Sequence, residues 1–162
     1  MLERGRHRLY RRETQLFAER HLPILQAWVD GYKTVDEMAS VIGKNTETVR
    51  KLRTEITSVL TEGIGKDPIA KAVTFALIHL TESLNFEVID AIRPKRQFTE
   101  REIAVIPLIV EGFNNGQIAD ALSLTRWEVR RSKNAILENL GVDSIYTVIA
   151  WGFRSVMRRR ES

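Results

Sequence analysis

The strongest constraint on the fold is an internal repeat with an offset of 81 residues. The segment FAERHLPILQAWVDGY, residues 17–32, aligns with FTEREIAVIPLIVEGF, residues 98–113. The identities are Phe17 with Phe98, Glu19 with Glu100, Arg20 with Arg101 and Gly31 with Gly112. After one-residue or longer adjustments in later turns, the alignment continues as far as Phe75 over Trp151. Because the offset changes only in turns, where insertions are tolerated, the sequence predicts two related units.

Apolar residues recur with helical spacing along the chain, and no alternating strand pattern is present. Turn signals divide the chain into pieces of roughly 8 to 18 residues, the usual length of globular helices. We therefore predict an all-α fold of two tandem four-helix units. The predicted parts are a basic tail (1–12), a first unit (13–84), a linker (85–96), a second unit (97–157) and a basic tail (158–162).

The second unit carries the clearest helix signals. Thr99 and Glu102 have the spacing of a capping box that opens its first helix. A short helix is predicted over residues 115–122, and a longer basic helix is predicted after the N-cap Thr125. A short helix, a tight turn and a longer basic helix form the helix-turn-helix pattern of DNA-binding proteins.

The repeat also separates core positions from exposed ones. Trp28 aligns with an isoleucine and Trp151 with a phenylalanine, so both indoles are predicted to lie in the core. Trp127 aligns with a glutamate and is predicted to be exposed, as a contact for DNA or a protein. Pro23 and Pro107 are each predicted to kink the first helix of their unit.

The second unit resembles the four-helix LuxR/GerE-type DNA-binding domain. The matching motifs are T-x-R-E from Thr99, E-G at Gly112, I-A-x-x-L from Ile118, T-x-x-x-V-R from Thr125 and I-x-x-x-L-G-V from Ile136. The first unit resembles the same family more weakly, through Asp30-Gly31, Met38-Ala39, Ile42, Thr48-Val49-Arg50, Ile56 and Leu60. Together the two resemblances cover most of the chain.

The resemblance implies that the third helix of each unit enters the DNA major groove. In the second unit the implied contact residues are Thr125, Arg126, Trp127, Arg130, Arg131 and Lys133. In the first unit they are Thr46, Thr48, Arg50, Lys51 and Arg53, among which Glu47 and Glu55 intervene. The alternative for the first unit is a degenerate copy that serves in dimerisation or protein binding.

Two residues depart from the family motif at the start of the recognition helix, Glu128 and Ser132. The carboxylate of Glu128 is expected to point toward phosphates or base edges. There it would either accept a hydrogen bond from cytosine N4 or weaken binding.

Composition excludes several classes of protein. The formal charge is +4, with arginines crowded at both ends, which suits phosphate backbones or alternatively a solubilising tail. The chain has no cysteine, which fits a reducing cytoplasm, and no apolar run long enough for a membrane helix. Its three histidines are scattered without a nucleophile or ligand pattern. We expect no enzyme activity, no cofactor and no metal.

The sequence therefore predicts a cytoplasmic transcriptional regulator whose partner is double-stranded DNA. The fourth helices, about residues 68–84 and 144–157, are expected to pair within one chain as a pseudo-dimer, or between chains as a homodimer. One alternative is a protein-interaction module that binds RNA polymerase or another regulator through Trp127. The other is a promoter-recognition factor of the sigma region-four kind, which the LGVDS segment and the helix after it disfavour.

Overall fold

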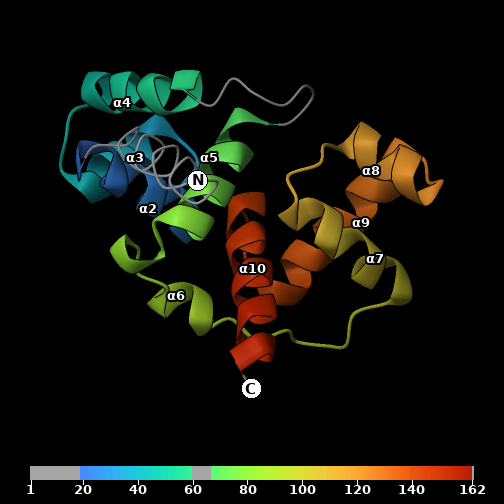
Figure 1. Cartoon of the computed structure of the whole chain (residues 1–162). Coiled ribbons are helices and arrows are strands. Elements are labelled where there is room, and N and C mark those ends of the chain that lie inside the picture. The colour runs from blue at the N-terminus through green and yellow to red at the C-terminus, as the bar shows by residue number, and fades with distance from the viewer. Residues whose placement is uncertain (1–18, 60–66, 162) are drawn as a thin grey trace, which may run out of the picture.

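The computed structural model describes residues 19–59 and 67–161 (Figure 1). The all-α prediction is confirmed, because within these ranges every regular element is a helix. The predicted basic tail over residues 1–12 lies outside the described residues, as do Leu60 of the repeat and the side chains of the predicted tail over 158–162.

The first half contains a 3-10 turn and four helices: η1 (Glu19–His21), α2 (Leu22–Asp30), α3 (Val35–Ile42), α4 (Thr46–Val59) and α5 (Pro68–His79). Two short elements follow, η2 (Thr81–Ser83) and α6 (Glu87–Asp90). The second half contains α7 (Glu100–Val110), α8 (Asn115–Leu122), α9 (Arg126–Leu140) and α10 (Ile145–Glu161).

The helix starts predicted for the second half agree with the structure, although α10 continues to Glu161, past the predicted end at residue 157. The Thr99 hydroxyl accepts a hydrogen bond from the Glu102 N–H at 3.2 Å, which closes the predicted capping box. The helix α8 spans the predicted residues 115–122, and Thr125 is the N-cap of α9. These boundaries depend on hydrogen bonds between residues three apart, so the local sequence is enough to determine them.

Three predictions about the first half and the linker after it were wrong in detail. Pro23 does not kink a helix, because it lies in the first turn of α2, where its missing N–H costs no hydrogen bond. The segment assigned to a linker contains α6, which buries Ile89 and the preceding Phe86. Asp90 at the end of α6 forms a two-bond ion pair with Arg154 of α10, at 2.7 and 3.1 Å. The fourth helix of the first half, α5, was predicted to end at about residue 84 but ends at His79.

The second helix of the first half, α3, begins and ends in the same way as the second helix of the second half, α8. Each of these helices ends at a residue in the left-handed backbone region. This residue is Gly43 for α3 and Ser123, 80 residues later, for α8. Capping boxes open both of these helices, through Thr34 in the first half and Asn114 in the second. Within the described residues the backbone therefore follows the same helix order twice, and the first two turns of each half have matching geometry.

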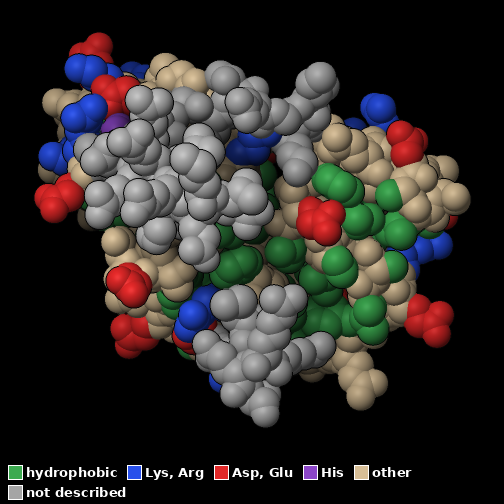
Figure 2. Space-filling model, viewed as in Figure 1, with side chains coloured by type: hydrophobic (Ala, Val, Ile, Leu, Met, Phe, Trp, Pro, Cys, Tyr) green, Lys and Arg blue, Asp and Glu red, His purple; other side chains and the backbone are tan. Residues whose placement is uncertain are grey.

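The helix α10 lies at the centre of the molecule (Figure 1) and packs against α2, α5, α6 and α7. One continuous core of buried side chains includes residues of both halves. Trp28 is fully buried in it, and Trp151 is half-buried beside Phe98, so both predicted core positions are confirmed. Figure 2 shows hydrophobic side chains gathered in the middle of one face, over α10 and α7.

The two halves contact each other in a reciprocal way. In each half, the start of the fourth helix lies against the end of the first helix of the other half. A Cβ built on Gly31, at the end of α2, would lie 2.8 Å from Thr147 Oγ1 of α10. A Cβ built on Gly112, after α7, would lie 3.8 Å from the Cβ of Ala70 on α5. The Tyr146 hydroxyl also donates to Asp67 Oδ2 at 2.6 Å, across 79 residues of sequence. We call this reciprocal contact region the seam.

Candidate nucleic-acid interface

The start of α9 is held by a closed capping box. The Thr125 hydroxyl accepts from the Glu128 N–H at 3.1 Å, and Glu128 Oε2 accepts from the Thr125 N–H at 2.8 Å. The hydrogen bond from the Thr125 backbone lowers the pKa of Glu128. Glu128 Oε1 lies 3.6 Å from Arg101 on α7.

The prediction for the Glu128 carboxylate was therefore wrong. This group turns back toward Thr125 and Arg101 instead of pointing outward toward a ligand. The signal for this role was present in the sequence, because Thr125-x-x-Glu128 has the same spacing as the capping box predicted at Thr99. Glu128 orders the helix start and neutralises part of the Arg101 charge.

Ser132, the second departure from the motif, is buried with Val129 and Ile136 on the inner face of α9. Its hydroxyl donates to the Glu128 carbonyl oxygen at 2.9 Å, one turn earlier. Ser132 therefore belongs to the packing face of the helix and not to its exposed face.

The exposed face of α9 presents an aromatic ring and a cation stacked together. The Trp127 side chain is exposed, and the residue retains 64% of its accessible surface. The Arg131 guanidinium lies 5.2 Å from the centre of the Trp127 ring, which is within cation–π range. Arg130 is also exposed. This contact restricts both side chains and holds a guanidinium on the outer face of the helix.

Arg126 lies at the junction of α8 and α9. A Cβ built on Gly116 would lie 3.1 Å from Arg126 Nη2, so the guanidinium covers the first turn of α8. The structure therefore brings together five of the six predicted residues, at the start and exposed face of α9: Thr125, Arg126, Trp127, Arg130 and Arg131.

Lys133 does not lie with the others. Its side chain is half-buried, and it lines a recess together with Asp67, the N-cap of α5. Burial lowers the pKa of Lys133, and the nearby Asp67 charge opposes this effect. One of the predicted DNA contacts thus lies at the seam.

In the first half, α4 presents a smaller set of cations. Asn45 Oδ1 accepts from the Thr48 N–H at 2.8 Å and so caps the start of the helix. Thr46 and Thr48 are half-buried, whereas Arg50 and Lys51 are exposed. These exposed cations lie on α4 without an exposed aromatic ring, because Glu47 stands where α9 has Trp127.

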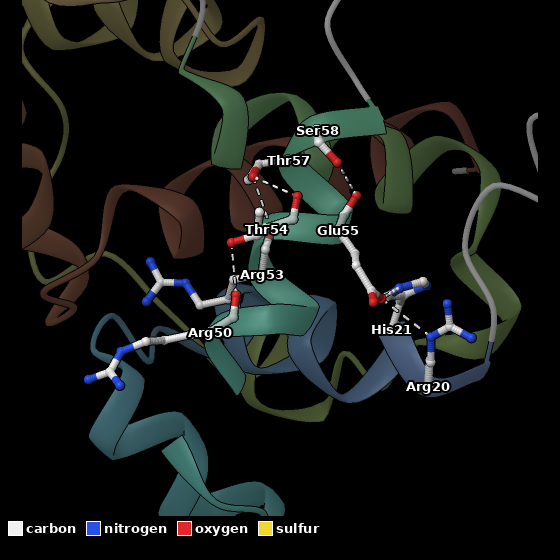
Figure 3. Close-up of polar contacts among 8 residues, drawn as sticks. All are labelled: Arg20, His21, Arg50, Arg53, Thr54, Glu55, Thr57 and Ser58. Carbon is white, nitrogen blue, oxygen red and sulfur yellow. Dashed lines mark hydrogen bonds and ion pairs between the residues drawn. The ribbon is translucent and has the colours of Figure 1, made fainter. Parts of the chain in front are cut away.

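Arg53 and Glu55 project from opposite sides of α4 (Figure 3). The Arg53 guanidinium lies 5.8 Å from the centre of the buried Trp28 ring. Glu55 Oε2 lies 2.8 Å from His21 Nε2 and 3.4 Å from Arg20 Nε, and the hydrogen bond with His21 lowers the pKa of Glu55. Glu55 therefore ties α4 to η1 and does not lie among the exposed cations of this helix.

The second half matches a known protein family. Residues 96–151 match the family model described as "Bacterial regulatory proteins, luxR family". This segment is a LuxR-family helix-turn-helix domain. The match covers α7, α8, α9 and the first part of α10. No curated protein and no solved structure matches the chain.

The LuxR-family domain supplies the exposed face of α9 described above, and its family is one of DNA-binding regulators. In the described residues, no cluster of three histidine or acidic side chains is arranged to hold a metal ion. None of the helices in residues 19–59 and 67–161 has the length and hydropathy required to span a bilayer.

Proposed function

We propose that the protein is a DNA-binding transcriptional regulator that inserts α9 into the major groove. The observation that carries this proposal is the exposed face of α9 within a LuxR-family domain. Arg130 and Arg131 suit bidentate recognition of guanine O6 and N7, and the Trp127 ring suits contact with a thymine methyl group or a sugar. Thr125 and Arg126, at the helix start, suit contacts with phosphate.

The first half acts as a second reading unit in this proposal. Its helix order and its first two turns match those of the LuxR-family domain, and α4 exposes Arg50 and Lys51. The reciprocal seam supports a pseudo-dimer within one chain, with α4 and α9 as its two recognition helices. The operator would then contain two half-sites about one helical turn apart.

The two half-sites would differ in sequence because the two helix tips differ. The helix α9 begins with a stacked Trp127–Arg131 pair, whereas α4 carries Glu47 and Lys51 at the equivalent positions. A homodimer of identical units favours a palindrome, whereas unlike units in one chain favour an asymmetric operator.

Selection of bound duplexes from a randomised DNA library tests this proposal most directly. We expect enrichment of two unlike half-sites, and a footprint that spans both of them for each bound chain. A footprint of one half-site per chain would disprove the pseudo-dimer while leaving α9 as a reader. If no sequence is enriched, specific regulation is wrong.

The second candidate is a module that binds a protein, and the exposure of Trp127 is the observation that favours it. The salt dependence of the binding affinity distinguishes the two candidate functions. DNA affinity should fall steeply as salt rises, because each phosphate contact releases counterions. Binding to a regulator or to polymerase through the Trp127 ring should be far less sensitive to salt.

A further inference from the structure

Beside the seam lies a recess that the proposed DNA contacts do not use. Its volume is about 200 Å³, and α5, α7, α8, α9 and α10 or the turns between them all contribute to its wall. The apolar part of the wall comes from Ala70, Ile109, Ile145 and Ile149. A second recess of about 270 Å³ shares Asn115, Lys133 and Ile145 with the first and extends to Arg130.

Two polar groups on this wall lack partners. Asn115 Oδ1 is buried and accepts no hydrogen bond. Within residues 19–59 and 67–161, Lys133 forms no ion pair shorter than 4.0 Å, although its side chain is half-buried. A buried acceptor is ordinarily paired, so the unpaired Asn115 oxygen beside the half-buried Lys133 ammonium points to a ligand that would pair with both.

The other charged groups on the wall are already occupied. Asp67 accepts from the Ile69 N–H at 2.8 Å and from the Tyr146 hydroxyl at 2.6 Å. Burial and this hydrogen bond raise the pKa of Tyr146, so its hydroxyl stays protonated and continues to donate to Asp67. Lys133 is therefore the cation that a ligand would meet, and Asp67 disfavours a ligand with two negative charges nearby.

We propose that this recess binds a small organic monocarboxylate that has a hydrogen-bond donor beside a branched apolar body. The carboxylate would pair with the Lys133 ammonium, and the apolar body would pack against Ile109, Ile145 and Ile149. Asn115 Oδ1 is closed to solvent, so the donor would reach it after the Asn115 side chain turns toward the recess. The size fits, because a cavity of about 150 Å³ holds benzene, so this recess takes a ligand of about eight non-hydrogen atoms. Because the wall includes α5 and α10, the bound ligand would contact both halves of the protein.

Three matched compounds test the chemistry, with methyl and side-chain amide NMR spectra of the full chain as the measurement. The probe is 2-hydroxy-3-methylbutanoate, which has the carboxylate, the donor and the branched body. Its control without the donor is 3-methylbutanoate, and its control without the charge is 2-hydroxy-3-methylbutanamide. We expect saturable shifts of the Ile145, Ile149 and Asn115 signals with the probe, and affinities at least tenfold weaker with either control.

Three variants test the location. Lys133→Met removes the cation but keeps the apolar stem, and Asn115→Ala removes the acceptor; each should weaken binding of the probe at least tenfold. Arg131→Met, on the same helix but outside the recess, should leave it unchanged. Equal binding of the probe and its amide, equal binding by Lys133→Met, or no saturable shift at millimolar concentrations would each overturn the proposal. The readout needs no DNA, so its failure is distinguishable from failure of the proposed regulator function.

Discussion

The two halves of this protein build the same four-helix order with different side chains at a few equivalent positions. Both halves keep the capping boxes that open their second helices and the left-handed residues that end them. At the tip of the third helix, however, Glu47 stands where the other half has Trp127. Local hydrogen bonding and core packing therefore restrict one set of positions, while exposed positions are free to differ.

The largest expected effect concerns the proposed DNA contacts. Replacing Arg130 and Arg131 by alanine should abolish detectable binding, because each arginine that reads a guanine contributes about 1–3 kcal/mol. The matched change in the first half, Arg50→Ala with Lys51→Ala, should cause a smaller loss. Mobility shifts at fixed salt measure both, and thermal melting by circular dichroism checks the fold. A greater loss from the first-half pair would make α4 the dominant reader.

The next largest effect is a change in stability at two equivalent positions in the middle of the fourth helices, Gly152 in α10 and Ala76 in α5. A Cβ built on Gly152 would lie 2.5 Å from Val110 Cγ2 of α7, so Gly152→Ala should destabilise the fold by about 1–3 kcal/mol. The reciprocal Ala76→Gly should cost about 1 kcal/mol through helix propensity and lost packing. Urea unfolding measures both changes. An unchanged urea midpoint for Gly152→Ala would contradict close packing of α10 against α7 at this position.

A pH effect is expected from Glu102, which is buried at the start of α7. Burial raises its pKa, but hydrogen bonds from Arg96 and Thr99 outweigh burial and hold the pKa below its usual value. A lowered pKa stabilises the folded state above the unfolded value of about 4.3, and this stability is lost as the pH falls through the folded value.

The variant Glu102→Gln should therefore lose about 1–2 kcal/mol near neutral pH and show a shallower loss of stability below about pH 4. The control is Glu37→Gln in the capping box of α3, where the carboxylate is exposed and a smaller change is expected. Urea unfolding across a pH series measures the slopes. Parallel curves for Glu102→Gln and the wild type would contradict the role assigned to the Arg96 ion pair.

The smallest expected effect concerns the ends of α3 and α8. Ser123 adopts φ of 55°, and among the described residues it is the one non-glycine residue with a positive φ. Ser123→Gly should stabilise the fold by up to about 1 kcal/mol, because glycine adopts this conformation without strain. Gly43→Ser should destabilise it by a similar amount. Thermal melting compares the pair, and a loss of stability in Ser123→Gly would point to a contact of the serine side chain.

Much of the fold was predictable because its signals are local. Thr99 and Thr125 predict helix starts through hydrogen bonds that span three residues, and the structure contains both. The same reasoning failed for Pro23, because the sequence does not indicate whether a proline opens a helix or interrupts it. It also missed Glu128 as a capping residue, because the resemblance directed attention to DNA chemistry at a position governed by helix capping.

By itself the sequence determined the helical class, most helix boundaries and the LuxR-family character of the second half, because periodicity, capping and motif spacing act over a few residues. Tertiary structure decided which cations remain on the exposed face. Lys133 lies at the seam near Asp67, while Arg131 stacks on Trp127. Lys133 and Asp67 are far apart in the chain, and only the packing of α5, α9 and α10 brings them together.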